Sequence, residues 1–191
     1  MRLRWMLLVL ALVLSGGVAE ARTKARTTAA AASRNTGDGL AAGNLILRGD
    51  IQLDYNQVQG QKQLILGVRT IAEYLVNRYF AIGGFLKTQY LWQGANTGAG
   101  MVDVGPRVSV YLVPSGIVHP YIGAQFGYHR LVQPGPDGNG IIVGPEVGVA
   151  IITGHFGAFI SAGYDFRWAK CSGVTLKRHA VPFSIGFGGR F

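Results

Sequence analysis

Apolar and polar side chains alternate along most of the chain after residue 44. From Leu45 to Tyr55 every second position is apolar or Gly, and Asp50 and Asp54 are among the residues between. Successive side chains of a β-strand point to opposite faces, so this period of two predicts a strand with one apolar and one polar face. Seven more stretches repeat the pattern. The eight expected strands are residues 45–55, 64–74, 80–92, 102–112, 118–128, 141–151, 156–168 and 181–191.

The two faces of these strands differ sharply in charge. The apolar face carries no charged residue, and its only polar side chains are Thr70 and Thr88. The polar face carries six acidic and six basic residues. They are Arg48, Asp50, Asp54, Arg69, Glu73, Lys87, Asp103, Arg107, Glu146, Asp165, Arg167 and Arg190.

The connections between the expected strands alternate in length. Four of them, at residues 56–62, 93–100, 131–140 and 169–178, have about seven to ten residues and predict long loops. The other three, near residues 77–78, 114–116 and 154–155, predict tight turns. Long loops on one rim and short turns on the other are typical of transmembrane up-and-down barrels. The expected fold is therefore all-β, an eight-stranded antiparallel up-and-down transmembrane β-barrel.

Alternation alone does not say which face points outward, since a soluble barrel of the lipocalin kind would have its apolar face inside. Two features favour an apolar outer face. The polar face holds eleven glycines, which suit a narrow lumen better than a solvated surface. The apolar face is aromatic at the strand ends and aliphatic in the middle, as in the two aromatic girdles of a membrane barrel.

The N-terminal residues have a different composition. Arg2 and Arg4 precede an apolar run over 5–14, and Ala19-Glu20-Ala21 follows, so residues 1–21 predict a secretory signal peptide, cleaved after Ala19 or Ala21. Residues 22–42 offer little to bury and predict a flexible, basic, Ala-rich periplasmic leader, which leaves 43–191 for the barrel.

Composition excludes several classes of protein. The net charge is +9, but the 18 basic residues are scattered, so we expect no nucleic-acid partner. A single cysteine, Cys171, excludes a disulfide-stapled mini-protein and a zinc ribbon. As the only thiol of an exported chain, it could stay free or form an intermolecular link.

The signal peptide, the alternating strands and the aromatic end of the chain resemble the small outer-membrane barrels of Gram-negative bacteria, namely the OmpX type and the transmembrane part of OmpA. The resemblance implies a location in the outer membrane. Phe183, Ile185, Phe187 and Phe191 resemble the signal for the barrel-assembly machinery. We expect no domain after the barrel of the kind that OmpA has, so the resemblance does not imply peptidoglycan binding. The expected loops are shorter than the protruding sheet of OmpX-like adhesion proteins, so it does not imply host-cell adhesion either.

Candidate chemistry is sparse. Eight strands enclose only enough room for side chains, so we expect the twelve inward charges to form an ion-pair network and not a pore. Lipid A deacylases with this fold use a Ser-His-acid arrangement facing the acyl chains, but no expected lipid-facing position holds Ser or His. His119 and His129 face the lumen ten residues apart, too far to share a metal. We therefore predict no catalytic residue, no cofactor and no metal.

The expected long loops are basic. Lys62, Arg130, Lys170, Lys177 and Arg178 stand against Asp137, a net charge of +4. Phosphate-rich lipopolysaccharide would lie at this rim, so electrostatic contact with it is one hypothesis and loop solubility the other. The sequence thus predicts a monomeric, non-enzymatic outer-membrane barrel with a structural or interaction role. A lipid-modifying enzyme and a small pore are the alternatives.

Overall fold

A computed structural model describes residues 39–58, 61–93, 97–132 and 137–191. The chain divides into two compact units, residues 1–37 and 38–191, and the described residues all belong to the second. The expected signal peptide and nearly all of the expected leader lie outside the described residues. Within the described residues, no helix is long and apolar enough to cross a membrane.

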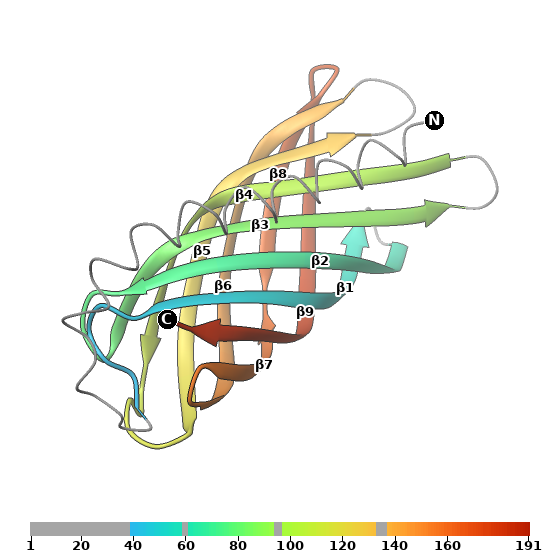
Figure 1. Cartoon of the computed structure of the whole chain (residues 1–191). Coiled ribbons are helices and arrows are strands. Elements are labelled where there is room, and N and C mark those ends of the chain that lie inside the picture. Colours follow the sequence, from blue (N-terminus) through green and yellow to red (C-terminus); the bar gives the residue numbers. More distant parts are fainter. Residues whose placement is uncertain (1–38, 59–60, 94–96, 133–136) are drawn as a thin grey trace. The chain divides into compact units, whose positions relative to one another are not determined.

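The described chain is a single antiparallel sheet closed on itself. Neighbouring strands pair in chain order, and the last strand, β9, pairs with β1, which closes the barrel (Figure 1). The strands are β1 (Leu45–Val58), β2 (Gln61–Leu75), β3 (Phe80–Gln93), β4 (Thr97–Tyr111), β5 (Val118–Val132), β6 (Gly138–Thr153), β7 (Phe156–Gly163), β8 (Asp165–Cys171) and β9 (Val174–Arg190).

β7 and β8 together form the seventh strand of the barrel. Both pair with β6 on one side and with β9 on the other. Their register is continuous, because Ala162 lies opposite Phe183 and Asp165 lies opposite Ala180. Only Tyr164 interrupts the ladder. The barrel therefore has eight strands, and the predicted fold class is confirmed.

The predicted difference between the two rims is wrong. β1 and β2 continue to Val58 and Gln61, and the other loop-side strands are extended in the same way, so the connections shrink to residues 59–60, 94–96, 133–137 and 172–173. The turn-side connections are residues 76–79, 112–117 and 154–155. We keep the names loop side and turn side for these two ends of the barrel.

The largest error lies in the last connection, where residues 169–178 were expected to be a loop. The chain instead turns on Ser172 and Gly173, and β9 begins at Val174. Both turn residues have positive φ, 48° and 82°. A pair of positive φ values is what a two-residue hairpin requires to match the twist of its strands. The Ser-Gly pair thus lets β9 begin seven residues earlier than the expected strand.

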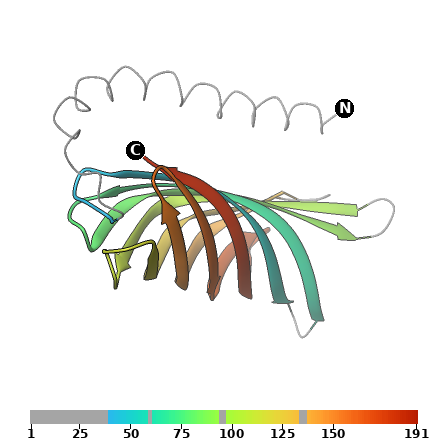
Figure 2. The same cartoon turned by 60° about the horizontal axis from the view of Figure 1, so that its bottom comes forward.

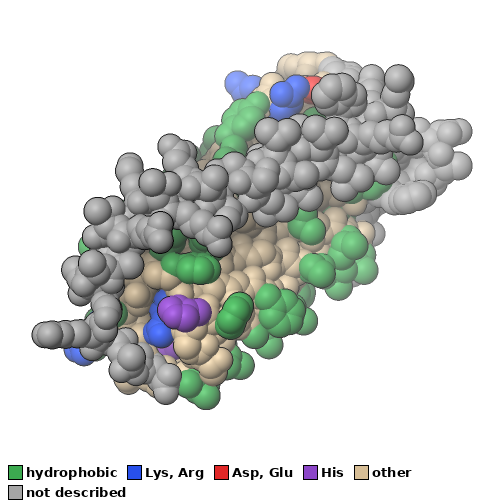
Figure 3. Space-filling model, in the orientation of Figure 1, with side chains coloured by type: hydrophobic (Ala, Val, Ile, Leu, Met, Phe, Trp, Pro, Cys, Tyr) green, Lys and Arg blue, Asp and Glu red, His purple; other side chains and the backbone are tan. Residues whose placement is uncertain are grey.

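The wall has the two faces that the alternation predicts. Outward side chains such as Ile51 and Phe187 are 64% and 73% exposed, whereas inward ones such as Ile71 are fully buried. The strands form one curved wall (Figure 2), and apolar side chains lie in several patches on the visible part of the wall in Figure 3. Glycines make room inside, because a Cβ on Gly123 would lie 2.6 Å from Arg107 Nη2.

Candidate functional site

The interior of the barrel gathers nearly all of the charges that the sequence placed on the polar face. Eleven of the twelve are at most 4% exposed. They are Arg48, Asp50, Asp54, Arg69, Glu73, Lys87, Asp103, Arg107, Glu146, Asp165 and Arg167. The twelfth, Arg190, is half-buried at the turn side and donates a hydrogen bond to the Gly39 carbonyl. It lies apart from the others.

Six of these charges form a turn-side cluster, made of Arg48, Arg69, Arg107, Asp50, Glu73 and Glu146. Glu146 on β6 lies at its centre and binds all three arginines. Arg107 Nη2 lies 3.0 Å from Glu146 Oε1, Arg48 Nη2 lies 3.2 Å from the same oxygen, and Arg69 Nη1 binds Oε2. Arg69 also pairs with Asp50 at 2.7 Å, and Arg107 pairs with Glu73 at 2.9 Å. Three cations thus balance three carboxylates.

Hydroxyl groups complete the turn-side cluster. Arg48 Nη1 donates to the Tyr121 hydroxyl at 2.7 Å, and that hydroxyl donates to Glu146 Oε1 at 2.8 Å. Tyr111 donates to Glu73 at 3.2 Å. Buried ion pairs are favourable only when further hydrogen bonds satisfy their remaining polar atoms. The tyrosines meet that requirement for both glutamates.

The other five charges form a loop-side cluster, made of Lys87, Arg167, Asp54, Asp103 and Asp165. Lys87 Nζ lies 2.8 Å from Asp54 and 2.9 Å from Asp165. Arg167 Nη2 contacts the same two carboxylates at 3.3 and 3.0 Å and reaches Asp103 at 3.2 Å. Two cations face three carboxylates. The imidazole of His129 hydrogen-bonds Asp103, the carboxylate that Lys87 does not contact.

A small apolar group also lies inside the barrel. Ile71, Phe85 and Ile142 pack together, and Ile71 lies between Arg69 and Glu73 on β2. No ion pair among the eleven buried charges joins the two clusters. The clusters are nevertheless neighbours, because Arg69 lies opposite Lys87 on β3.

A strap of residues 39–44 crosses the turn-side mouth. Arg190 on β9 binds the Gly39 carbonyl, while the Leu40 amide donates to the Pro114 carbonyl at 2.8 Å. Pro114 follows β4, on the opposite side of the eight-stranded wall from β9. The Leu40 side chain is 5% exposed and packs with the apolar residues that close this mouth. They are Ile46, Leu75, Ala81, Tyr111, Tyr121, Ala150, Ile152 and Phe159.

The loop-side mouth is also apolar. Ile65, Ala99, Met101 and Leu131 pack together with Leu176 beside them. Cys171 is buried at the end of β8, close to this cluster, because a Cβ on Gly138 would meet both Leu131 and Cys171. The thiol therefore lies inside the barrel and not in an outer loop, where the sequence placed it.

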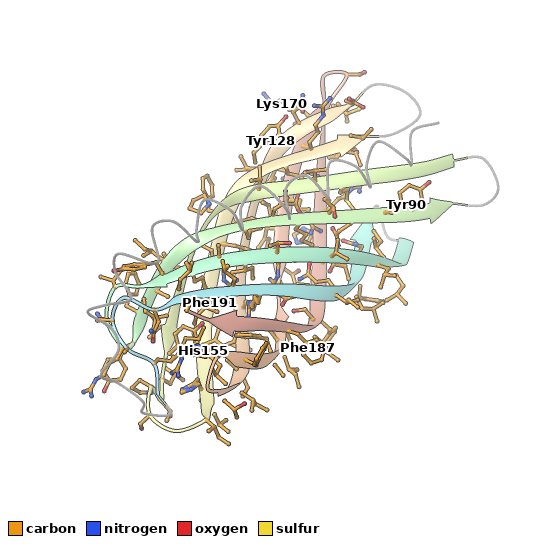
Figure 4. The ribbon with its side chains drawn as sticks, in the orientation of Figure 1. Tyr90, Tyr128, His155, Lys170, Phe187 and Phe191 are labelled. Atoms are coloured by element: carbon orange, nitrogen blue, oxygen red, sulfur yellow. The ribbon has the colours of Figure 1, made fainter. Side chains whose placement is uncertain are left out.

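The basic residues of the loop-side rim separate into two groups. Arg130, Lys170 and Lys177 lie on the outer face of β5, β8 and β9, whereas Arg178 points into the lumen and donates to Met101 Sδ. Figure 4 shows Lys170 near Tyr128 at this end, far from Phe187 and Phe191 at the other. The Asp137 carboxylate accepts a hydrogen bond from Arg130 and raises the pKa of that guanidinium. The side chain of Lys62 lies outside the described set.

One statement about the outer face is wrong. The sequence predicted no histidine on a lipid-facing position, but His179 lies on the outer face of β9, because β9 begins earlier than expected. Its ring contacts Phe166, and its Nδ1 lies 3.3 Å from the Tyr164 hydroxyl. The outer positions beside it on β8 and β1 are Phe166 and Gln57, not serine. A Ser-His pair is therefore not formed around His179.

The described interior also holds polar side chains that the sequence did not single out. The amides of Gln52 and Gln89 are buried, and both polar atoms of each have no protein partner. They lie on either side of Gly67 on β2. No group of three or more His, Cys, Asp or Glu with the geometry of a metal site occurs among the described residues. Unpaired buried amides of this kind are the usual partners of internal water.

Comparison with solved structures identifies the fold. The chain is similar to neisserial surface protein A, with 17% sequence identity over 78% of this chain and 99% of that one and a TM-score of 0.64. It is also similar to the outer membrane protein OprG from Pseudomonas aeruginosa (14% identity, 81% and 98% coverage, TM-score 0.54). No family model and no curated sequence matches.

A third similar structure is that of Ail, the attachment invasion locus protein of Yersinia pestis, in complex with the heparin analogue sucrose octasulfate. It shows 12% identity, 78% and 99% coverage and a TM-score of 0.56. At these identities the similarity establishes the architecture, and that architecture is the small eight-stranded barrel of outer-membrane proteins.

Proposed function

We propose that this protein is a structural barrel of the bacterial outer membrane, closed to solutes, with an outer rim that interacts with lipopolysaccharide. The observation that carries the proposal is the difference in polarity between the outer and inner faces of the wall. Between the two rims, the side chains that point outward are apolar except for Thr70 and Thr88, while eleven buried charges are inside and paired with one another. A wall of this kind is stable only if its outer face lies in lipid.

A closed lumen follows from the contents of the barrel. Apolar side chains fill both mouths, and the two ion clusters occupy the lumen between them. A solute would have to displace Leu40 and its strap, separate the Glu146 arginines and then separate Lys87 from its carboxylates. An eight-stranded barrel provides no spare cross-section for such a path. The protein therefore acts through its surface.

Val104 provides the direct test of the outer face. It lies in the middle of β4 and is 45% exposed on the outer surface. Val104→Arg should lower the unfolding free energy in lipid vesicles by ~2–4 kcal/mol, the cost of an arginine near the bilayer midplane. Val113→Arg is the matched control, because Val113 is similarly exposed, at 44%, but lies in the turn after β4. It should cost only ~0–1 kcal/mol.

Equal stability of the two arginine variants would mean that the outer face is not in lipid, and the proposal would fail. The closed lumen has a separate test in planar bilayers, where the wild-type protein should give no steady single-channel current. A reproducible conductance would replace the structural role with that of a small pore.

A further inference from the structure

The outer face of the loop side carries a row of cations directly above a row of aromatic side chains. Arg130 on β5 lies opposite Asn139 on β6, and Asn139 lies opposite Lys170 on β8. One step lower, Tyr128, Ile141 and Trp168 form the corresponding row, and Trp168 lies opposite Lys177 on β9. All of these side chains are on the outer surface, with Tyr128 46% exposed and the Arg130 side chain 53% exposed.

The rows below are apolar. Phe126, Val143 and Phe166 follow on the same three strands, and the Trp168 ring stacks on Phe166 with their centroids 6.0 Å apart. Aromatic side chains of membrane proteins gather at the level of the lipid headgroups. The cations of the upper row therefore lie where the headgroup charges of a leaflet would be, and the apolar rows lie where its acyl chains would be.

We infer that Arg130, Lys170 and Lys177 bind the phosphates of one acylated, doubly phosphorylated glycolipid of the lipid A type, whose chains cover Phe126, Val143 and Phe166. This inference rests on the proposed function, because it requires the outer face to be in the membrane. Lys and Arg donors bind phosphate oxygens by charge-assisted hydrogen bonds. We name these three cations the phosphate row, in which Lys177 lies one step below Arg130 and Lys170.

The width of the phosphate row favours two phosphates over one. From β5 to β9 the wall passes through three strand spacings of about 4.8 Å, so the cations extend over about 14 Å. A lipid with a single phosphate would contact one end of the row and leave the cation at the other end without a phosphate. A headgroup with a phosphate at each end can engage Arg130 and the two lysines together.

Asp137 should weaken phosphate binding at Arg130, so its removal should change the affinity in the opposite direction to removal of the cations. Its carboxylate lies 3.0 Å from Arg130 Nη2, and both side chains are exposed. A phosphate at Arg130 would have to approach this negative charge. Asp137→Asn removes the repulsion and frees a guanidinium donor, so it should tighten binding, whereas neutralising the cations should weaken it.

The experiment measures binding of the full chain, refolded in neutral detergent, to bisphosphorylated lipid A by native mass spectrometry. Monophosphorylated lipid A and phosphatidylglycerol serve as the other probes. Each cation near a phosphate contributes roughly fivefold in affinity. Lys170→Gln should therefore lower the affinity for bisphosphorylated lipid A roughly fivefold. The triple variant Arg130→Gln/Lys170→Gln/Lys177→Gln should lower it roughly a hundredfold. Arg78→Gln is the matched control, because Arg78 is an exposed cation on the turn side, stacked on Tyr79.

Each outcome bears on the inference. Loss in the triple variant, no change in Arg78→Gln and a gain in Asp137→Asn support it. Equal losses in Lys170→Gln and Arg78→Gln would reduce the effect to net charge and overturn it. Equal affinity for monophosphorylated lipid A or for phosphatidylglycerol would overturn the assignment to a doubly phosphorylated lipid. Failure here leaves the comparison of Val104→Arg with Val113→Arg unaffected, so the site can fail while the membrane barrel stands.

Discussion

The two ion clusters of the lumen are built from similar residues but differ in how completely their charges are paired. In the turn-side cluster, three arginines face three carboxylates, and Glu146 alone receives hydrogen bonds from all three. In the loop-side cluster, Lys87 and Arg167 face three aspartates. The first cluster is neutral by itself, and the second has one carboxylate in excess.

The chemistry of the cations deepens this difference. A guanidinium offers five donors in a fixed plane, so Arg69 and Arg107 can each fix two carboxylates in orientation. The Lys87 ammonium is a compact charge on a flexible chain and fixes orientation less well. Each cluster has buried polar atoms without a hydrogen-bond partner, such as Asp50 Oδ1 on the turn side and Asp54 Oδ1 on the loop side, and the loop side adds the amides of Gln89 and Asn56. The turn-side cluster should therefore be the rigid part of the lumen and the loop-side cluster the adaptable part.

The largest effect that tests this comparison comes from Glu146→Gln. The substitution keeps the shape but removes the charge that holds Arg48, Arg69 and Arg107 together. Removal of one partner from a buried ion pair typically costs ~3–5 kcal/mol. The unfolding free energy, measured by urea titration in lipid vesicles, should fall by that amount.

Asp137→Asn is the matched control for Glu146→Gln, because it also removes a carboxylate that pairs with an arginine, but at the surface. Exposed ion pairs contribute only ~0–1 kcal/mol. Similar losses in the two variants would show that the turn-side cluster is not a buried network.

A middle-sized effect should come from Leu40→Ala. The side chain is buried among Tyr111, Tyr121 and Phe159 beneath the turn-side cluster. Leucine-to-alanine changes in a core cost ~2–5 kcal/mol, and a strap that can shift should lie near the lower value. The same urea titration measures the loss. Unchanged stability would mean that the strap does not seal the turn side.

The sequence predicted the wall well because its period of two follows directly from strand geometry. Ile51 and Phe187 are outside and Asp50 and Glu146 are inside, as the alternation requires. Ion partners could not be predicted in the same way. Arg48 and Glu146 are 98 residues apart, and Arg167 and Asp54 are 113 residues apart. Only the register and closure of the barrel bring them together.

The ends of the strands and of the barrel were predicted less well, as the start of β9 and the place of Leu40 show. Lys177 and Arg178 suggested a loop, although the preceding Ser172-Gly173 pair is a hairpin signal. Leu40 was assigned to the leader with its small and polar neighbours. Leu40 is, however, the single large apolar side chain between residues 22 and 44. That isolated apolar residue could have predicted that the strap covers the turn-side mouth. Arg130 and Lys170 were also counted with the expected long loops, so the sequence did not predict that they lie with Lys177 on the outer face of strands.

The smallest effect should come from Asp103→Asn in the loop-side cluster. This change also removes a buried carboxylate, but from the cluster that has one in excess, so the remaining charges are two cations and two aspartates. Arg167 loses its ion pair with Asp103 at 3.2 Å, and the hydrogen bond to His129 is altered, but Arg167 keeps Asp54 and Asp165 as partners at 3.3 and 3.0 Å. The loss of one of three neighbouring negative charges offsets part of the lost attraction. The net loss should be that of one hydrogen bond, ~0.5–1.5 kcal/mol, well below that of Glu146→Gln. If Asp103→Asn proves as costly as Glu146→Gln, charge balance does not govern the lumen, and the distinction between a rigid and an adaptable cluster would have to be abandoned.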